Sequence, residues 1–171
     1  MDYIEAHGTG TILGDPIEAS ALGRVLGAGR GVDTPILLGS AKTNIGHSES
    51  AAGVVGLIKV IQAMRNDVIP ANINYSAPNR YIDFEAEHLE VVEDPREWPE
   101  YSGHKVAGVS GFGFGGTNAH VVLTDYRGTP AERAPQLSTE TVALPVSGLL
   151  PSRRARAAAP VSYTHLRAHE T

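Results

Sequence analysis

Residues 106–124, VAGVSGFGFGGTNAHVVLT, place a glycine-rich stretch between two apolar runs that are rich in β-branched residues. Runs of this kind, at 106–110 and 119–124, are typical of β-strands, and the glycines between them are typical of a tight loop. Gly111, Gly113 and Gly116 also have the G-x-G-x-x-G spacing of a dinucleotide-binding loop. Such a loop opens a helix, whereas a strand-like run follows here. We therefore favour a strand–loop–strand unit over a nucleotide site.

A serine nucleophile is a second alternative for the same stretch, because Ser110 lies in the sequence GVSGF. The nucleophile elbow G-x-S-x-G requires glycine two positions after the serine, where this chain has Phe112, and it requires a helix next. Neither condition is met, so this alternative is the weaker of the two.

The chain outside this stretch alternates strand-like and helix-like segments, which favours an α/β layered fold. A helix is expected after Asp15, which would be its N-cap, with Glu18 completing a capping box. A second helix is expected over 48–65, where apolar residues cover most of the circumference and predict burial between layers. The expected strands before residue 106 are 3–6, 35–41, 68–73 and 89–94, and 42–47 is expected to be a loop.

Composition excludes several classes of protein. The chain has 171 residues, a net charge of −5 and no cysteine, so disulfides, thiolate metal sites and thiol nucleophiles are absent from it. The acidic balance argues against nucleic-acid binding. Because there is neither a secretory signal nor an apolar run of membrane-spanning length, we expect a cytoplasmic protein that does not insert into membranes.

The sequence changes character near residue 126. Prolines punctuate an Ala-, Arg- and Ser-rich segment, and we expect a domain over 1–125 followed by a loosely structured linker over 126–160. Residues 161–171 resemble a translated sequencing adapter, and we expect an unstructured, non-native tail. His165 and His169 in this tail are spaced four apart, but without a third ligand they predict no metal site.

Two histidines stand in loops that could carry chemistry. His7 opens HGTGT directly after a strand, and His47 closes KTNIGH just before the second helix. Glycines beside them allow close approach of a substrate, Lys42 adds positive charge, and Thr9 and Thr11 offer hydroxyl groups. These residues suit the stabilisation of a negative oxygen or a proton transfer. The alternative is that both histidines are hydrogen-bonded polar residues without a chemical role.

Four blocks of sequence resemble, in order and spacing, the C-terminal half of a β-ketoacyl synthase (ketosynthase) domain of a type I polyketide or fatty acid synthase. The blocks are EAHGTGTILGDPIEASAL (5–22), GSAKTNIGHSESAAGVVGLIKV (39–60), VIPANINYSAPN (68–79) and GVSGFGFGGTNAHVVL (108–123). The resemblance implies a thiolase-like layered αβαβα fold, of which this chain would be the C-terminal half. It also implies an acyltransferase that condenses an acyl thioester with malonyl-type acyl carrier protein by decarboxylative Claisen chemistry.

The resemblance assigns roles and partners as well. His7 and His47 would be catalytic with Lys42, and Thr9 and Thr11 would contact the phosphopantetheine arm. Phe114 would supply an oxyanion-hole N–H and gate the acyl chain, its backbone freed by the neighbouring glycines. Expected partners are the acyl carrier protein, a second copy in a homodimer and a following acyltransferase domain. No bound cofactor is implied, because phosphopantetheine is the substrate carrier.

One departure from the family pattern stands out. The family's nucleophilic cysteine belongs to the N-terminal half, and this chain has no cysteine. The chain begins just before the first histidine block, so we expect a piece of a ketosynthase that is inactive alone. A non-catalytic homologue is the remaining alternative, although the intact His7 and His47 blocks favour descent from an active enzyme.

Overall fold

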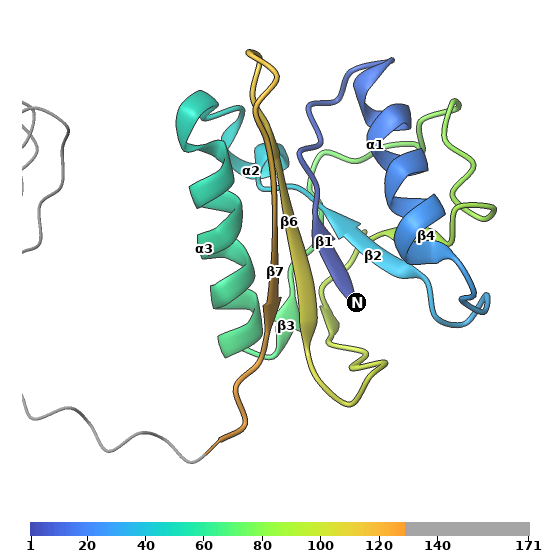
Figure 1. The fold of residues 1–171 in the computed structure, drawn as a ribbon, viewed down its shortest axis with the longest axis vertical. Coiled ribbons are helices and arrows are strands. Elements are labelled where there is room, and N and C mark those ends of the chain that lie inside the picture. Colours follow the sequence, from blue (N-terminus) through green and yellow to red (C-terminus); the bar gives the residue numbers. More distant parts are fainter. Residues whose placement is uncertain (129–171) are drawn as a thin grey trace, which may run out of the picture. The chain divides into compact units, whose positions relative to one another are not determined.

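The structure of the protein, a computed structural model, describes residues 1–128. Most of the expected linker and the whole expected tail, with His165 and His169, lie outside the described residues. Five strands form one sheet in the order β4-β2-β1-β6-β7 (Figure 1). Their bounds are β1 Tyr3–Glu5, β2 Ile36–Gly39, β4 Leu89–Val91, β6 Val106–Phe112 and β7 Asn118–Thr124.

The sheet is parallel except at one edge. β1 pairs in parallel with β2 and with β6, and β2 with β4, whereas β7 runs antiparallel to β6. β6 and β7 are the two runs expected to flank the glycine-rich stretch, and a tight hairpin joins them. The strand–loop–strand prediction is therefore confirmed, and the strand that follows Gly116 removes the helix on which a nucleotide loop depends.

The helices follow the expected order with shifted bounds. The first comprises α1, Gly14–Leu22, and a π-helical turn, Gly23–Gly27, while α3 spans Ala52–Arg65 after a 3-10 turn, Glu49–Ala51. The expected loop at 42–47 instead contains the short helix α2, Lys42–Ile45. Two short strands, β3 Val68–Ile69 and β5 Arg96–Glu97, form a separate antiparallel pair.

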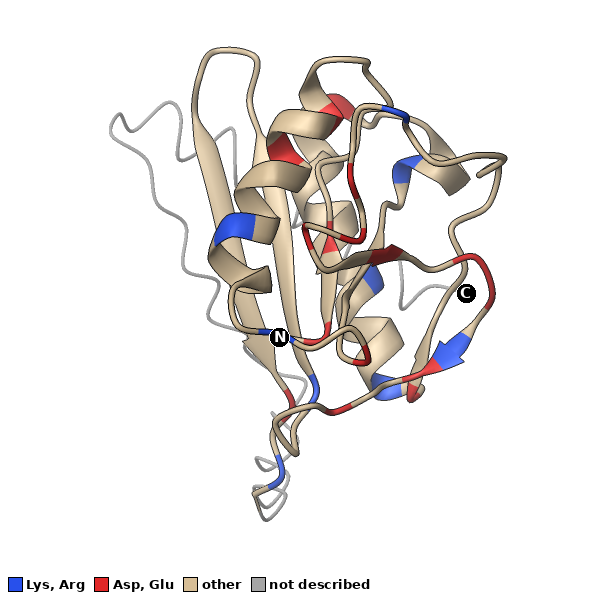
Figure 2. Ribbon diagram, turned by 90° about the vertical axis from the view of Figure 1, so that its right-hand side faces the viewer, with Lys and Arg blue, Asp and Glu red and all other residues tan. Residues whose placement is uncertain are grey.

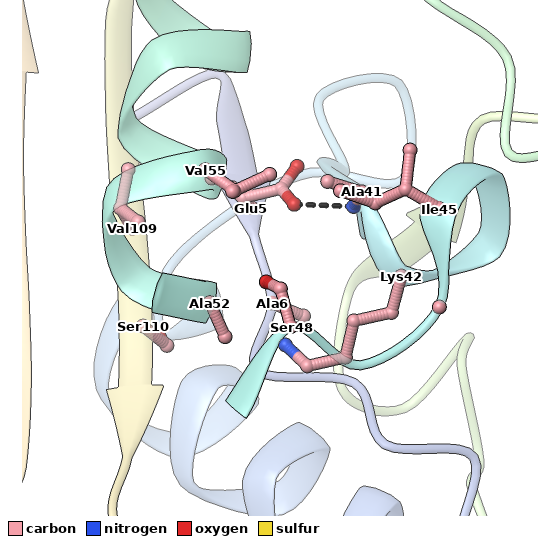
Figure 3. Close-up of a pocket in the computed structure, with 12 residues that line it drawn as sticks. Glu5, Ala6, Ala41, Lys42, Ile45, Ser48, Ala52, Val55, Val109 and Ser110 are labelled. Carbon is pink, nitrogen blue, oxygen red and sulfur yellow. Dashed lines mark hydrogen bonds between the residues drawn. The ribbon is translucent and has the colours of Figure 1, made fainter. Parts of the chain in front are cut away.

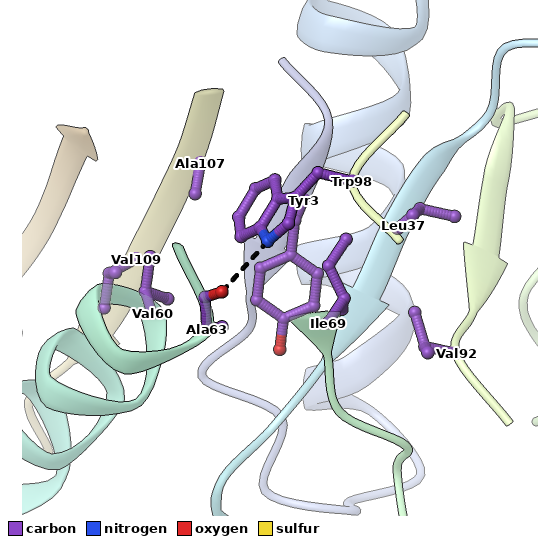
Figure 4. Close-up of a cluster of buried hydrophobic side chains, with 9 residues drawn as sticks. All are labelled: Tyr3, Leu37, Val60, Ala63, Ile69, Val92, Trp98, Ala107 and Val109. Atoms are coloured by element: carbon purple, nitrogen blue, oxygen red, sulfur yellow. Dashed lines mark hydrogen bonds between the residues drawn. The ribbon is translucent and has the colours of Figure 1, made fainter. Parts of the chain in front are cut away.

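Helices α1 and α3 cover opposite faces of the sheet (Figure 1). Successive strand residues point to opposite faces, so Tyr3 packs on the α3 side while Ile4 packs on the α1 side. On the α3 side, Trp98 meets Tyr3 edge to face at 6.1 Å and donates its indole N–H to the Ala63 carbonyl over 3.2 Å (Figure 4). This cluster fixes α3 against β1 and β6.

Burial of α3 differs from the expectation. The helix buries Gly56, Val60 and Ala63, whereas Val54 and Ile58 are 60% and 54% exposed. The five-stranded sheet and the short strand β3 pack against one side of α3, so the apolar side chains on its opposite side stay largely exposed within residues 1–128. The two helix glycines also differ, because a Cβ on Gly56 would lie 2.9 Å from Glu5 Cγ while one on Gly53 would meet nothing within 4 Å.

Charged residues of both signs occur on most described elements, but residues 106–124 of the β6–β7 hairpin include none. Figure 2 shows Lys and Arg positions scattered among Asp and Glu positions on the ribbon. In this part of the chain, no helix combines the length and apolar character needed to cross a bilayer.

Candidate functional site

The site forms where three parallel strands end at one edge of the sheet. β1 leads into the HGTGT loop, β2 leads into α2, and β6 leads into the β6–β7 hairpin. Because the carboxyl ends of parallel strands lie side by side, these three connections converge. They bring together His7, His47 and Phe112, which are far apart in sequence.

The two predicted histidines are neighbours. Their ring centroids are 5.6 Å apart and the rings meet nearly perpendicular, at 81°. His7 Nδ1 accepts the backbone N–H of Phe112 over 3.3 Å, and His47 Nδ1 accepts the backbone N–H of Glu49 over 2.9 Å. A neutral imidazole that accepts at Nδ1 carries its proton at Nε2. The backbone thus sets both rings to the same tautomer, with two Nε2–H donors available.

Local electrostatics keep the pKa of His7 below its ordinary value of 6.5. Partial burial is the largest cause, followed by the positive charge of Lys42 and the electrostatic effect of the neighbouring His47, while Asp15 acts in the opposite direction. Burial also lowers the pKa of Lys42, against the opposing charges of Glu5, Glu18 and Asp15. His7 is therefore the neutral donor at neutral pH, not an acid.

Glu18 does not form the expected capping box. Its two carboxylate oxygens accept the backbone N–H groups of His7, over 2.8 Å, and Gly8, over 3.0 Å. The loop turns back over the start of α1 through positive φ angles at Gly8 and Gly10, of 44° and 71°. The N–H groups of this loop, and not those of the first turn of α1, therefore donate to the Glu18 carboxylate. Burial raises the pKa of Glu18, and the two hydrogen bonds oppose that rise.

The threonines of the HGTGT loop lie at the surface. Thr9 Oγ1 and Thr11 Oγ1 are 3.4 Å apart and exposed, and Thr11 Oγ1 accepts the Gly14 N–H over 3.1 Å. Two exposed hydroxyl groups on one loop can bind an amide-bearing ligand. Their predicted contact with phosphopantetheine stays a prediction.

The glycine-rich hairpin places its two phenylalanines differently. Phe112 lies against His7, with ring centroids 5.2 Å apart, whereas Phe114 at the tip is fully exposed. Sequence reasoning singled out Phe114 and missed the contact of Phe112. The position of Phe112 could have indicated this contact, because Phe112 is the last residue of β6, at the end of the strand that faces the site.

Only some hairpin glycines are required by its conformation. Gly116 has a φ of 88°, and a Cβ on Gly113 would lie 3.0 Å from the Thr117 carbonyl oxygen. Gly115 has ordinary φ, and a Cβ there would meet nothing within 4 Å. The freedom expected from all three glycines is thus used at Gly113 and Gly116.

A buried ionic cluster beside the site also escaped sequence reasoning. Glu5 Oε1 accepts the backbone N–H of Ala41 over 2.5 Å, and Glu5 Oε2 accepts Tyr3 OH and Lys59 Nζ, each over 2.7 Å. Glu5 and Lys42 line the same small cavity, about 10 Å³ in volume, beside α2 (Figure 3). The available signal was a charged residue inside an apolar strand and another inside an apolar helix.

Ser110 is not placed as a hydrolase nucleophile. It lies within β6, which continues to Phe112, and its Oγ is 3.0 Å from His120 Nδ1 on β7. A strand, not the helix of a nucleophile elbow, follows the hairpin. Residues 1–128 contain no group of three or more His, Asp or Glu arranged to hold a metal ion.

Comparison with known proteins identifies the family of this chain. The family profile described as "Beta-ketoacyl synthase, C-terminal domain" matches residues 1–76, and "Ketoacyl-synthetase C-terminal extension" matches residues 78–167. A phenolphthiocerol/phthiocerol polyketide synthase of Mycobacterium tuberculosis is 51% identical over 84% of this chain, which spans 8% of that protein. Polyketide synthase GfsB of Streptomyces halstedii is 47% identical over 86% of this chain, which spans 3% of that protein.

Solved structures show the same fold. Ketosynthase twelve of the bacillaene polyketide synthase of Bacillus amyloliquefaciens is 44% identical, with a TM-score of 0.68 over 76% of this chain and 23% of that one. The fold of the described residues thus corresponds to part of a thiolase-like ketosynthase. This chain belongs to the β-ketoacyl synthase family, as a C-terminal ketosynthase segment with its C-terminal extension, of the kind found in modular type I polyketide synthases.

Proposed function

We propose that this chain supplies the two-histidine half of a site for decarboxylative Claisen condensation in polyketide biosynthesis. The observation that carries the proposal is the pairing of His7 and His47, whose rings lie 5.6 Å apart. Both accept backbone N–H groups at Nδ1, so both offer Nε2–H. Two neutral donors aimed at one oxygen stabilise an enolate without supplying an acid that would quench its carbon.

The reaction divides between two parts of the domain. A cysteine thiolate attacks an acyl thioester, forms a new thioester and releases the donor thiol. Malonyl on the acyl carrier protein then breaks its bond to the carboxylate, releases CO₂ and leaves the electron pair as an enolate. The enolate carbon attacks the acyl–cysteine carbonyl and expels the thiolate. This chain has no cysteine, so the nucleophile belongs to another part of the domain.

The remaining site residues receive supporting roles. Burial lowers the pKa of His7 most, and the positive charge of Lys42 adds to that effect, so Lys42 helps to keep the ring neutral. Thr9 and Thr11 bind the amides of the phosphopantetheine arm through their exposed hydroxyl groups. The Phe114 N–H completes an oxyanion hole for the acyl thioester, and its exposed ring gates the acyl chain.

The polyketide assignment rests on the relatives. The matched proteins from Mycobacterium and Streptomyces are named as polyketide synthases, and this chain spans 8% or less of each. We infer that the segment works in a long multidomain polypeptide, as part of a homodimeric ketosynthase served by an acyl carrier protein. We also infer that residues 126–160 link it to a following acyltransferase domain.

The test uses an intact ketosynthase, defined here as a domain in which a cysteine-bearing N-terminal part precedes the 171 residues of this chain. His7→Asn and His47→Asn should each lower CO₂ release from malonyl carrier protein by about 100-fold or more, while acylation of the cysteine continues. His88→Asn is the matched control, since His88 has a positive φ of 53° that asparagine adopts readily. Unchanged CO₂ release in both site variants would contradict the proposal.

A further inference from the structure

The condensation chemistry makes no use of the buried cluster of Tyr3, Glu5 and Lys59. The side chains of Lys59 and Glu5 are only 14% and 4% exposed, and Lys59 Nζ lies 2.7 Å from Glu5 Oε2. Lys59 Nζ also donates to Tyr3 OH over 2.8 Å. Burying two charges carries a desolvation penalty, so this pair is poor evidence for a purely stabilising role.

Glu5 connects the elements that carry the site. It ends β1, two residues before His7. Its Oε1 accepts the N–H of Ala41, the residue directly before Lys42 at the start of α2. Its Oε2 is held by Lys59 of α3, and a Cβ on Gly56 of the same helix would lie 2.9 Å from Glu5 Cγ. The carboxylate is thus fixed between β1, α2 and α3.

Two lysines compete for this one carboxylate. Lys42 lines the same small cavity as Glu5, yet within residues 1–128 its ammonium forms no ion pair with a carboxylate. Figure 3 shows the Lys42 side chain extending toward Ser48 and Ala6, whereas the Glu5 carboxylate is turned toward Ala41. Lys59, and not Lys42, forms the ion pair that neutralises Glu5.

We propose that Lys59 is a positioning residue for the histidine pair, because by neutralising Glu5 it keeps Lys42 from pairing with that carboxylate. Lys42 then stays directed at the His7 side of the site. The role of the histidines in condensation rests on the proposed function. The pairing of Glu5 with Lys59 instead of Lys42 rests only on the observed contacts of Glu5.

Removing Lys59 should move charge at the site in a predictable direction. In Lys59→Met, the Glu5 carboxylate loses its cation partner and attracts Lys42, which withdraws positive field from His7. The charged and titratable groups around His7 are Lys42 of α2, His47 and Asp15 of α1, and Glu18 accepts the backbone N–H of His7. The substitution replaces none of these residues, so only the placement of Lys42 changes. The pKa of His7 should therefore rise, and protonated ring should accumulate at mildly acidic pH.

The intact ketosynthase provides the kinetic test. Lys59→Met should lower the condensation rate at about pH 6 by roughly threefold or more relative to its rate at about pH 8, with little change in KM. The double variant Glu5→Gln/Lys59→Met removes both charges and should restore the ratio. Glu5→Gln alone removes the negative charge and should move the acid limb of the profile to lower pH. This variant tests the proposal if Lys59→Met does not fold.

Two further measurements separate positioning from stability and from catalysis. Arg96→Met breaks the exposed Arg96–Glu90 pair, whose side chains are 41% and 46% exposed, and should leave the profile unchanged. Side-chain NMR titration of His7 follows its protonation without any turnover, so it tests the charge distribution even if His7→Asn proves active. An unmoved acid limb in Lys59→Met, or a double variant as shifted as the single one, would overturn the proposal.

Discussion

His7 Nδ1 accepts the backbone N–H of Phe112 over 3.3 Å, although 105 positions separate the two residues. The contact joins the loop after β1 to the end of β6, and it fixes the tautomer of His7 through a strand that makes no chemical contribution of its own. The hairpin that follows Phe112 therefore does more than carry Phe114. Its geometry decides which nitrogen of His7 can donate a hydrogen bond.

The acidic limb of the pH–rate profile should lie below the ordinary pKa of histidine. Neutral His7 is the working form, and burial and Lys42 lower its pKa below 6.5, so the neutral ring persists as pH falls past that value. Lys42→Met removes the positive charge and should move the limb to higher pH, whereas Lys42→Arg should not. Condensation assays from about pH 5 to 8 test this. A limb that does not move in Lys42→Met would show that Lys42 acts otherwise.

Glu18 should contribute to stability and activity by supporting the HGTGT loop and not by capping its own helix. Glu18→Ala leaves the N–H groups of His7 and Gly8 without their acceptors and should cost about 1–3 kcal/mol of stability. Condensation should fall with it, because His7 loses its support. Glu18→Gln keeps one acceptor oxygen and should give an intermediate value in both assays. Equal effects of the two substitutions would argue against a hydrogen-bonding role.

The two glycines of α3 should respond in opposite ways to alanine. Gly56→Ala places a Cβ 2.9 Å from Glu5 Cγ and should destabilise the chain by about 1–3 kcal/mol. Gly53→Ala meets nothing within 4 Å and should stabilise the helix by about 0.5–1 kcal/mol. Trp98, the single tryptophan and buried in the core, reports unfolding in urea. Destabilisation of equal size at both positions would contradict the packing described here.

Within the hairpin, glycine should be required at 116 and dispensable at 115. Gly116→Ala must adopt a φ of 88° and should cost about 1–2 kcal/mol, with a fall in condensation as the tip rearranges. Gly115→Ala has ordinary φ and open space, so the condensation rate should hold. The reverse order of effects in the intact ketosynthase would mean that the tip changes conformation during turnover.

The uncovered face of α3 should make the 171-residue chain self-associate. Val54 and Ile58 are more than half exposed there, and exposed apolar patches promote association. Val54→Gln/Ile58→Gln should reduce particle size in light scattering without loss of helical signal. Val60→Gln is the contrasting variant, because Val60 is fully buried and its replacement should unfold the chain. Unchanged association in the double variant would place the adhesive surface elsewhere.

The sequence by itself predicted most strands and helices in their order along the chain and the hairpin at 106–124, and it proposed His7, Lys42 and His47 as site residues; it did not predict α2 or β5. Those features are local or periodic: β-branched runs, helical apolar patterns and glycines beside polar residues all act over a few positions. The resemblance added the family, and the comparisons confirmed it. The roles assigned to His7, His47, Lys42, Phe114, Thr9 and Thr11 remain predictions.

Only the tertiary structure decided which groups meet. Glu18 had the spacing of a capping box, yet it binds the loop of His7, because the loop folds back over α1. Glu5 and Lys59, 54 positions apart, form a buried pair. Phe112, and not the expected Phe114, contacts His7. Pairings of this kind depend on the register of parallel strands and the placement of helices on them. These are long-range relations that no local pattern in the chain encodes.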